Sequence, residues 1–150
     1  MNRRLLAAIL AGLLMSIGIA VPAQAALCHQ SSCNGQDPGA KQCNDTSSGN
    51  LASFYYNGSD PYLAGVLLEL RRSRNCDAAW ARTTGLDCLP MWRPCGFVLQ
   101  VQGGTEQLGG GPGGGQKWTN MWSFRQYVRA CFIIWTTDDS YRTDGCTGWH

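Results

Sequence analysis

The sequence has few of the side chains that carry acid–base, metal or nucleophilic chemistry. It contains two histidines, His29 and His150, and two glutamates, Glu69 and Glu106. No two cysteines form a C-x-x-C pair and no G-x-S-x-G stretch occurs, so the local signatures of a zinc site and of a hydrolase nucleophile are missing. His29 lies next to Cys28 and His150 is the last residue of the printed sequence, so the two histidines are far from each other in sequence. We therefore predict no catalytic residue, no metal site and no cofactor.

Charge is also scarce, at 15% of the residues. The formal net charge of +2 comes entirely from Arg3 and Arg4, because the rest of the chain has ten basic and ten acidic residues. A neutral chain without a basic stripe lacks the electrostatic footprint of a nucleic-acid-binding protein. We predict no nucleic-acid partner.

Residues 1–25 have the organisation of a cleavable secretory signal. Two arginines precede an uncharged apolar run, Leu5 to Ala20, and Ala23-Gln24-Ala25 supplies a small-x-small cleavage motif. The alternative is a membrane anchor, since about 16 to 18 apolar residues approach the minimum for a membrane span. The proline and cleavage motif that follow the run favour a signal. We predict a secreted protein, in the envelope or beyond it, whose mature chain is one domain over residues 26–150 without membrane contact.

The mature chain is rich in cysteine. An even number of cysteines in a small exported domain predicts up to four disulfides, each contributing about 2–4 kcal/mol. A zinc site is the alternative. Eight cysteines allow 105 pairings, so composition alone leaves the connectivity open. The cysteines are Cys28, Cys33, Cys43, Cys76, Cys88, Cys95, Cys131 and Cys146.

Short apolar segments separated by glycine- and proline-containing turns predict an all-β fold, a small disulfide-stabilised antiparallel sandwich or barrel. In the segment Tyr62–Arg72, Val66, Leu68 and Leu70 would share one strand face and Leu67, Glu69 and Arg71 the other. A helix over Leu63–Arg74 is the rival interpretation. The expected strands are Leu51–Tyr56, Tyr62–Arg72, Ala78–Thr84, Phe97–Gln102 and Ala130–Thr137, the last of them central.

Residues 103–116 contain eight glycines and one proline. A segment with so little apolar surface cannot offset its backbone entropy, so we predict a flexible surface loop. The alternative, a phosphate-binding loop, would require a Gly-Lys-Ser/Thr sequence after the glycines, which is not there.

The segment ELRRSRNCDAAWAR, residues 69–82, resembles the hallmark of a family of actinobacterial exported domains of unknown function, approximately E-L-R-x-S-x-x-C-x-x-x-W-A-R. CHQSSCNGQDPGAKQC, residues 28–43, is similar to the family's C-x4-C-x-G-x-D-P opening, and WTNMW and VRAC resemble its closing segment. The resemblance implies an exported domain or the outer part of a membrane-tethered regulator. It also suggests two separate disulfide sets, one among Cys28, Cys33, Cys43 and Cys76 and the other among Cys88, Cys95, Cys131 and Cys146.

Four residues of the central motif form a candidate structural unit: Glu69, Arg71, Trp80 and Arg82. If residues 67–71 and 80–82 are paired strands, Glu69 could meet Arg82 or Arg71 across the ladder. A charge on a partly buried face needs an opposite partner with good hydrogen-bond geometry. We predict a fold-specifying ion pair with Trp80 as a core anchor, and keep a catalytic carboxylate as the alternative.

Three tryptophans, Trp118, Trp122 and Trp149, lie in polar or loop-like sequence. Exposed aromatic rings can stack on sugars or anchor a protein interface, although most tryptophans of a small domain build its core. We predict a non-enzymatic secreted domain that binds a glycan or protein of the cell envelope. A small hydrolase or hydrolase inhibitor is the first alternative, and a purely structural envelope component the second.

Overall fold

The computed structural model describes residues 25–45, 47–88, 95–110 and 115–150. Residues 1–24, which are all of the predicted signal except Ala25, lie outside the described part. One short 3-10 helix, η1 (Gln30–Cys33), precedes the strands. The strands are β1 (Ser48–Tyr55), β2 (Leu67–Ser73), β3 (Ala78–Thr84), β4 (Cys95–Val101), β5 (Glu106–Gly109), β6 (Gln116–Trp118), β7 (Trp122–Ser123), β8 (Val128–Trp135) and β9 (Tyr141–Cys146).

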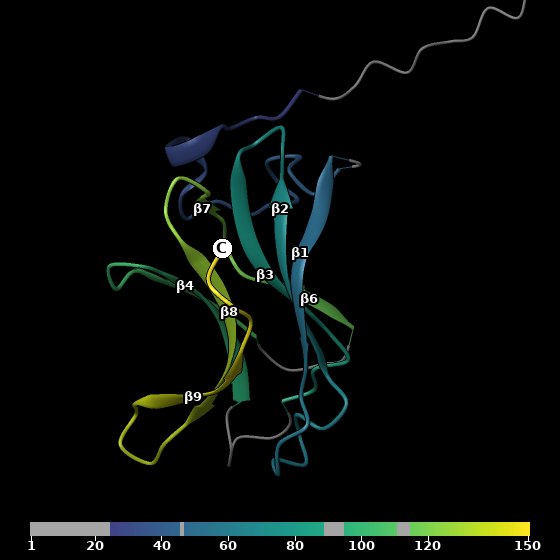
Figure 1. Ribbon diagram of the computed structural model, residues 1–150, viewed down its shortest axis with the longest axis vertical. Helices are drawn as coiled ribbons and strands as arrows, with labels where there is room; N and C mark the ends of the chain where they lie inside the picture. The colour runs from purple at the N-terminus through teal and green to yellow at the C-terminus, as the bar shows by residue number, and fades with distance from the viewer. Residues whose placement is uncertain (1–24, 46, 89–94, 111–114) are drawn as a thin grey trace, which may run out of the picture.

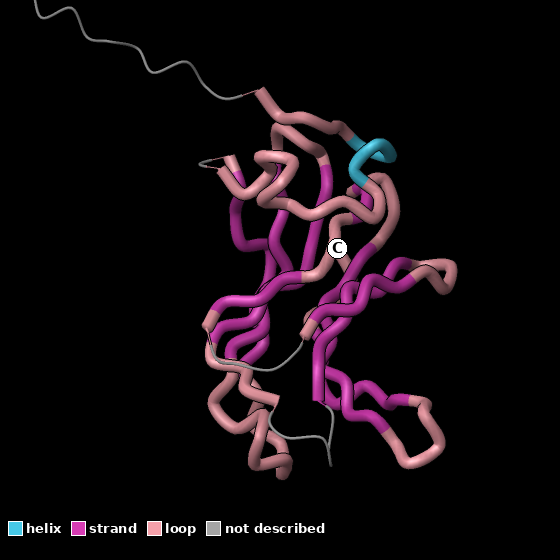
Figure 2. The backbone as a smooth tube through the Cα atoms, turned by 180° about the vertical axis from the view of Figure 1, so that it is seen from behind, coloured by secondary structure: helices cyan, strands magenta, loops and turns pink. Residues whose placement is uncertain are grey.

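The strands form two antiparallel sheets (Figure 1). The first sheet has the order β1-β2-β3-β6, with β7 also pairing with β3, and the second has the order β5-β4-β8-β9. The sheets pack face to face without closing into a barrel, so the fold is the sandwich of the two predicted architectures. Figure 2 shows the two groups of strands from behind. Within the described residues, no helix has the length and apolar content of a membrane span.

The main hydrophobic core lies between the two sheets. Leu68 and Leu70 of β2 pack there with Phe97, Leu99 and Phe132 of the second sheet. Each fully buried side chain of this size contributes about 1.5–3 kcal/mol. The alternation predicted for β2 is confirmed, because Leu68 and Leu70 face this core. β8 is an interior strand, as predicted, and Phe132 on its inner face is fully buried.

Two of the predicted segments need correction. The strand expected over Tyr62–Arg72 begins only at Leu67, because the chain from Pro61 to Gly65 turns and Gly65 adopts φ +75°, which closes the turn before β2. The glycine-rich segment is not a continuous loop. Glu106–Gly109 forms β5 and pairs with β4, because Gly103 and Gly104, both with positive φ, supply the hairpin turn.

Four disulfides staple the sandwich: Cys28–Cys33, Cys43–Cys76, Cys88–Cys95 and Cys131–Cys146. No bridge joins the two predicted sets. The sulfur atoms of the first two disulfides lie within 4.8 Å of one another, so these bridges pack together as one buried unit. Cys131–Cys146 instead joins the directly paired strands β8 and β9.

Candidate functional site

The four motif residues lie together on the outer face of the first sheet. The register of β2 and β3 pairs Glu69 with Arg82 and Arg71 with Trp80. Because strand side chains alternate, these positions point away from the core that receives Leu70. The four motif residues therefore form two adjacent cross-strand pairs. These pairs place one carboxylate, two guanidinium groups and one indole on the same surface.

Glu69 and Arg82 form the ion pair that the sequence predicts. Arg82 Nε donates to Glu69 Oε2 at 2.7 Å and Arg82 Nη2 donates to Oε1 at 3.0 Å, a bidentate geometry. Arg71 Nη1 lies 3.7 Å from the same Oε1, an ionic contact longer than a hydrogen bond. Glu69 is only 6% exposed. Its two oxygens thus act as the counter-ion of the arginines, which disfavours the alternative of a catalytic carboxylate.

Arg71 is the less satisfied of the two arginines. Burial lowers the pKa of its guanidinium below the ordinary value, the nearby Arg82 lowers it further, and Glu69 offsets part of this effect. Arg71 stays protonated at neutral pH, since arginine does not lose its proton in proteins. Because burial is the largest cause of this shift, Arg71 is a cation partly removed from water.

The N-terminal segment covers part of this outer face. We call residues 25–45 the cover. Its disulfide cysteines pack with Trp80 and Met121 in a second buried cluster, and Trp80 is 2% exposed. Backbone hydrogen bonds tie the cover to the chain beside β7: Gly35 N donates to Met121 O at 3.0 Å, and Met121 N donates to Gln36 O at 2.8 Å. Trp80 is the core anchor that the sequence predicts.

Trp118 stands at the other side of the covered face. Its backbone pairs with Arg82 between β6 and β3, and its indole Nε1 donates to Asp37 Oδ2 of the cover at 2.8 Å. Burial opposes ionisation of Asp37, but hydrogen bonds from Ala40, Trp118 and Gly39 outweigh it, so the pKa of Asp37 is below its ordinary value. The charged Asp37 carboxylate thus fixes the edge of the Trp118 indole, while Trp118 remains 39% exposed.

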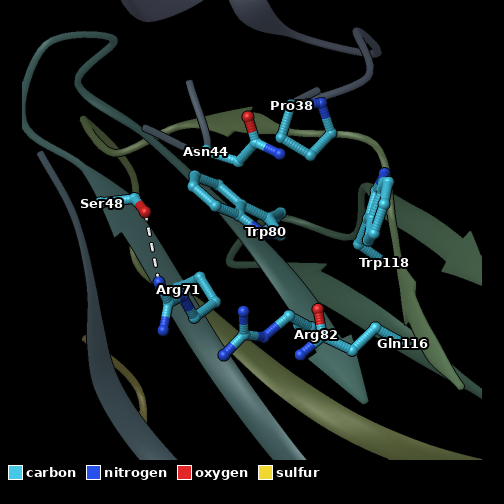
Figure 3. A pocket seen from close by; sticks show the side chains of 8 residues that line it. All are labelled: Pro38, Asn44, Ser48, Arg71, Trp80, Arg82, Gln116 and Trp118. Carbon is cyan, nitrogen blue, oxygen red and sulfur yellow. Dashed lines mark hydrogen bonds between the residues drawn. The ribbon is translucent and has the colours of Figure 1, made fainter. Parts of the chain in front are cut away.

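These elements enclose a cavity of about 180 Å³ between the cover and the sheet (Figure 3). This is roughly six times the volume of one water molecule in the liquid. In Figure 3 the Trp118 ring stands across the cavity from Ser48 and Arg71, with Trp80 and Arg82 between them. The lining offers two cations, two indoles and several neutral polar groups. It consists of Pro38, Asn44, Ser48, Arg71, Trp80, Arg82, Gln116 and Trp118.

The other two predicted contact aromatics lie elsewhere. Trp122 is half buried, packs against the main core and donates from Nε1 to Gln126 Oε1 at 2.6 Å. Trp149 is 44% exposed and lines a different cavity, on the second sheet, where the Arg129 guanidinium lies 4.5 Å from the centre of its ring. The three tryptophans therefore do not form one platform, and only Trp118 belongs to the cavity beside the motif.

The sequence motif predicts a structural role for the arginines but not their place in the lining of a cavity. The alternation at positions 69, 71, 80 and 82 was the available signal, because it places these residues on one face. Pro38 and Asn44 carried no such signal. They reach the cavity because the Cys43–Cys76 disulfide holds the cover against the end of β2.

Comparison of the chain with protein-family models, curated proteins and solved structures finds no match. The geometry of the cavity is therefore the basis on which a function can be argued.

Proposed function

We propose that this chain is a secreted, disulfide-stabilised domain that binds a glycan of the cell envelope, with one sugar unit held in the cavity against Trp118. The observation that carries the proposal is a half-exposed indole forming one wall of a small polar cavity. A flat aromatic face suits the apolar face of a sugar ring, and the ring presents large contact area at low conformational cost.

The remaining lining suits the polar edge of a sugar. Asn44 and Gln116 each offer an amide donor and an amide acceptor, and Ser48 offers a hydroxyl. Ligand sites commonly combine apolar walls with a few placed polar groups. The Asp37–Trp118 hydrogen bond fixes the indole before binding, so less side-chain entropy is lost when the ligand arrives.

Secretion is part of the same proposal. Four disulfides in a chain of this size suit an oxidising compartment. The predicted signal at residues 1–25 and the motif resemblance to exported actinobacterial domains point in the same direction. Trp118, in the WTNMW segment, and the motif residues Arg71, Trp80 and Arg82 would then be the part of that pattern that contacts the ligand.

The hydrolase alternative receives less support from the cavity. Glycoside hydrolysis in its usual form requires two carboxyl groups that flank the scissile bond. None of the described residues that line the cavity is acidic, and Glu69 beneath it is held by Arg82. Binding without turnover therefore fits the described chemistry better.

The test is a titration of the oxidised domain with soluble envelope glycan fragments, followed by tryptophan fluorescence and calorimetry. Trp118→Ala should weaken binding at least tenfold, equivalent to about 1.4 kcal/mol. Trp149→Ala is the matched control, because this ring is similarly exposed but lines the other cavity. Equal losses in both variants, or no glycan binding alongside Trp118-dependent binding of an envelope protein, would refute the proposal.

A further inference from the structure

The two arginines that line the cavity share a single carboxylate. Arg71 and Arg82 contribute two positive charges and Glu69 one negative charge, which leaves a surplus of one within this cluster. Asp37 adds a second negative charge beside the Trp118 wall, where it accepts hydrogen bonds from Trp118 Nε1 and Ala40 N; among the described residues it forms no ion pair with either arginine. A charge that is partly removed from water and incompletely paired favours a ligand of opposite sign.

The surplus belongs to Arg71 and not to Arg82. Arg82 directs two nitrogens to Glu69 at 2.7 and 3.0 Å, so its fork is occupied. Among the described residues, Arg71 donates a hydrogen bond to a single oxygen, Ser48 Oγ, at 3.2 Å from Nη2 (Figure 3). A guanidinium has five N–H donors, so Arg71 retains free donors beside the cavity that it lines.

We propose that the glycan taken by this cavity is acidic and that Arg71 binds a carboxylate carried by the sugar. The inference rests on the proposed function, since it specifies the sugar that stacks on Trp118. The planar fork of arginine matches a carboxylate in two parallel hydrogen bonds. A carboxylate also neutralises the surplus of one charge, whereas a phosphate monoester brings about −1.5 to −2 at pH 7 and would leave excess negative charge.

Three probes that share one ring test this assignment: glucuronic acid, glucose and glucose 6-phosphate. Glucuronic acid should bind the oxidised domain about tenfold more tightly than glucose, the gain expected for a charge-assisted hydrogen bond. Glucose 6-phosphate should bind less tightly than glucuronic acid. Phosphate-selective binding would overturn the carboxylate assignment.

Variants separate the roles of charge and geometry. Arg71→Gln should remove the preference for glucuronic acid, measured as the ratio of the dissociation constants of glucose and glucuronic acid. Arg71→Lys should retain part of the preference for glucuronic acid, because the positive charge stays while the planar guanidinium is lost. This variant also tests the inference if Arg71→Gln does not fold. Arg74→Gln is the control for net charge, since Arg74 is exposed and does not line this cavity. An equal loss in Arg74→Gln would overturn the inference.

The two proposals fail in different ways. If glucose and glucuronic acid bind equally and Trp118→Ala weakens both, the sugar site stands and the acidic ligand is wrong. If none of the three probes binds and envelope glycan fragments also fail to bind, the proposed function itself is wrong.

Discussion

The two outer faces of the sandwich differ in the residues they carry and in how disulfides are placed on them. On the first sheet the outer face carries charges and two indoles, and a disulfide-tied cover closes over part of it. On the second sheet it carries, next to the Arg129–Trp149 cavity, an apolar cluster in which Val98, Cys131 and Ile133 are buried and Trp135 and Tyr141 pack at the edge. Both faces use disulfides, but the second face uses its bridge between paired strands and the first uses its bridges to position loops.

If the proposed function holds, this difference separates stability from ligand binding. Cys131–Cys146 reinforces contacts that the β8–β9 ladder already makes. Cys43–Cys76 instead fixes a segment that has little regular structure of its own, and this segment supplies Pro38 and Asn44 to the cavity. We therefore expect disruption of the first face to change the site and disruption of the second to change mainly the free energy of unfolding.

The largest effect should come from removing Cys43–Cys76 with the double variant Cys43→Ala/Cys76→Ala. The bridge spans 33 residues, so its loss should lower the free energy of unfolding by about 3–4 kcal/mol, measured by urea denaturation. The cover should also loosen, which trypsin would detect as faster cleavage after Lys41, together with loss of glycan binding.

The matched control is Cys131→Ala/Cys146→Ala, whose bridge spans 15 residues and should contribute about 3 kcal/mol. Stability alone would hardly distinguish the two variants. Cleavage after Lys41 at the same rate in both, under conditions where both remain folded, would contradict the assigned roles of the two faces.

A smaller effect should follow from breaking the buried ion pair with Glu69→Gln. Arg71 and Arg82 would lose their counter-ion on a partly buried face, which should cost about 1–3 kcal/mol. Arg142→Gln provides the comparison on the second sheet. Its partner is Asp144, but the Arg142 side chain is 61% exposed, so the loss should be within about 0.5 kcal/mol. The urea midpoints of the two variants measure these losses of stability. Similar losses in both would show that solvent exposure does not determine how much each ion pair stabilises the fold.

Acid should weaken the first face through Asp77. Its pKa is lowered chiefly by the hydrogen bond from Arg72, with further contributions from Arg72 charge, Gln30 and Arg125 that outweigh burial. A carboxyl group with a lowered folded-state pKa stabilises the fold above its unfolded value, here 3.8, and this stabilisation is lost as the pH falls below it.

Asp77→Asn should therefore lose about 1–2 kcal/mol at pH 7 and show a shallower fall in urea midpoint between pH 4 and pH 2. The left-handed backbone of Asp77, φ 46°, suits asparagine, so the turn between β2 and β3 should survive. An unchanged acid profile in this variant would show that other carboxylates control the acid stability of the cover.

The sequence predicts the sheets far better than it predicts the cavity. Strand alternation at Leu68 and Leu70 and the two-residue spacing of Glu69 and Arg71 depend on local geometry, so they can be recognised in one segment. The cavity depends on where the cover packs against the first sheet. Nothing local relates Asn44 to Gln116, because a disulfide and a strand pairing bring them together.

Errors at the segment ends have the same origin. The glycine-rich segment was expected to be a loop because its composition has little apolar surface, yet Glu106–Gly109 pairs with β4 as a strand. Backbone hydrogen bonds to an existing strand can order residues that have no apolar side chain to bury. The free edge of β4 thus pairs with residues 106–109, for which the composition alone predicts no regular structure.

The smallest effect should appear at the link between the two sheets, where the Tyr56 hydroxyl at the end of β1 donates to Asp144 Oδ2 of β9. Burial raises the pKa of Tyr56 above 10.0, and the hydrogen bond to Asp144 raises it further. The folded state thus favours the protonated phenol, so its stabilisation is complete below pH 10 and is lost as the pH rises through the raised pKa.

Tyr56→Phe keeps the ring that packs 5.7 Å from the Phe132 ring and removes only the hydroxyl, so it should cost about 1 kcal/mol at pH 7. The variant should also lose part of the decline in stability above pH 10, measured as urea midpoints. Glycan binding should be unchanged, because Tyr56 does not line the cavity beside Trp118. Weaker binding in Tyr56→Phe would mean that the packing of the two sheets controls the first face, and the separation of the two faces would then be wrong.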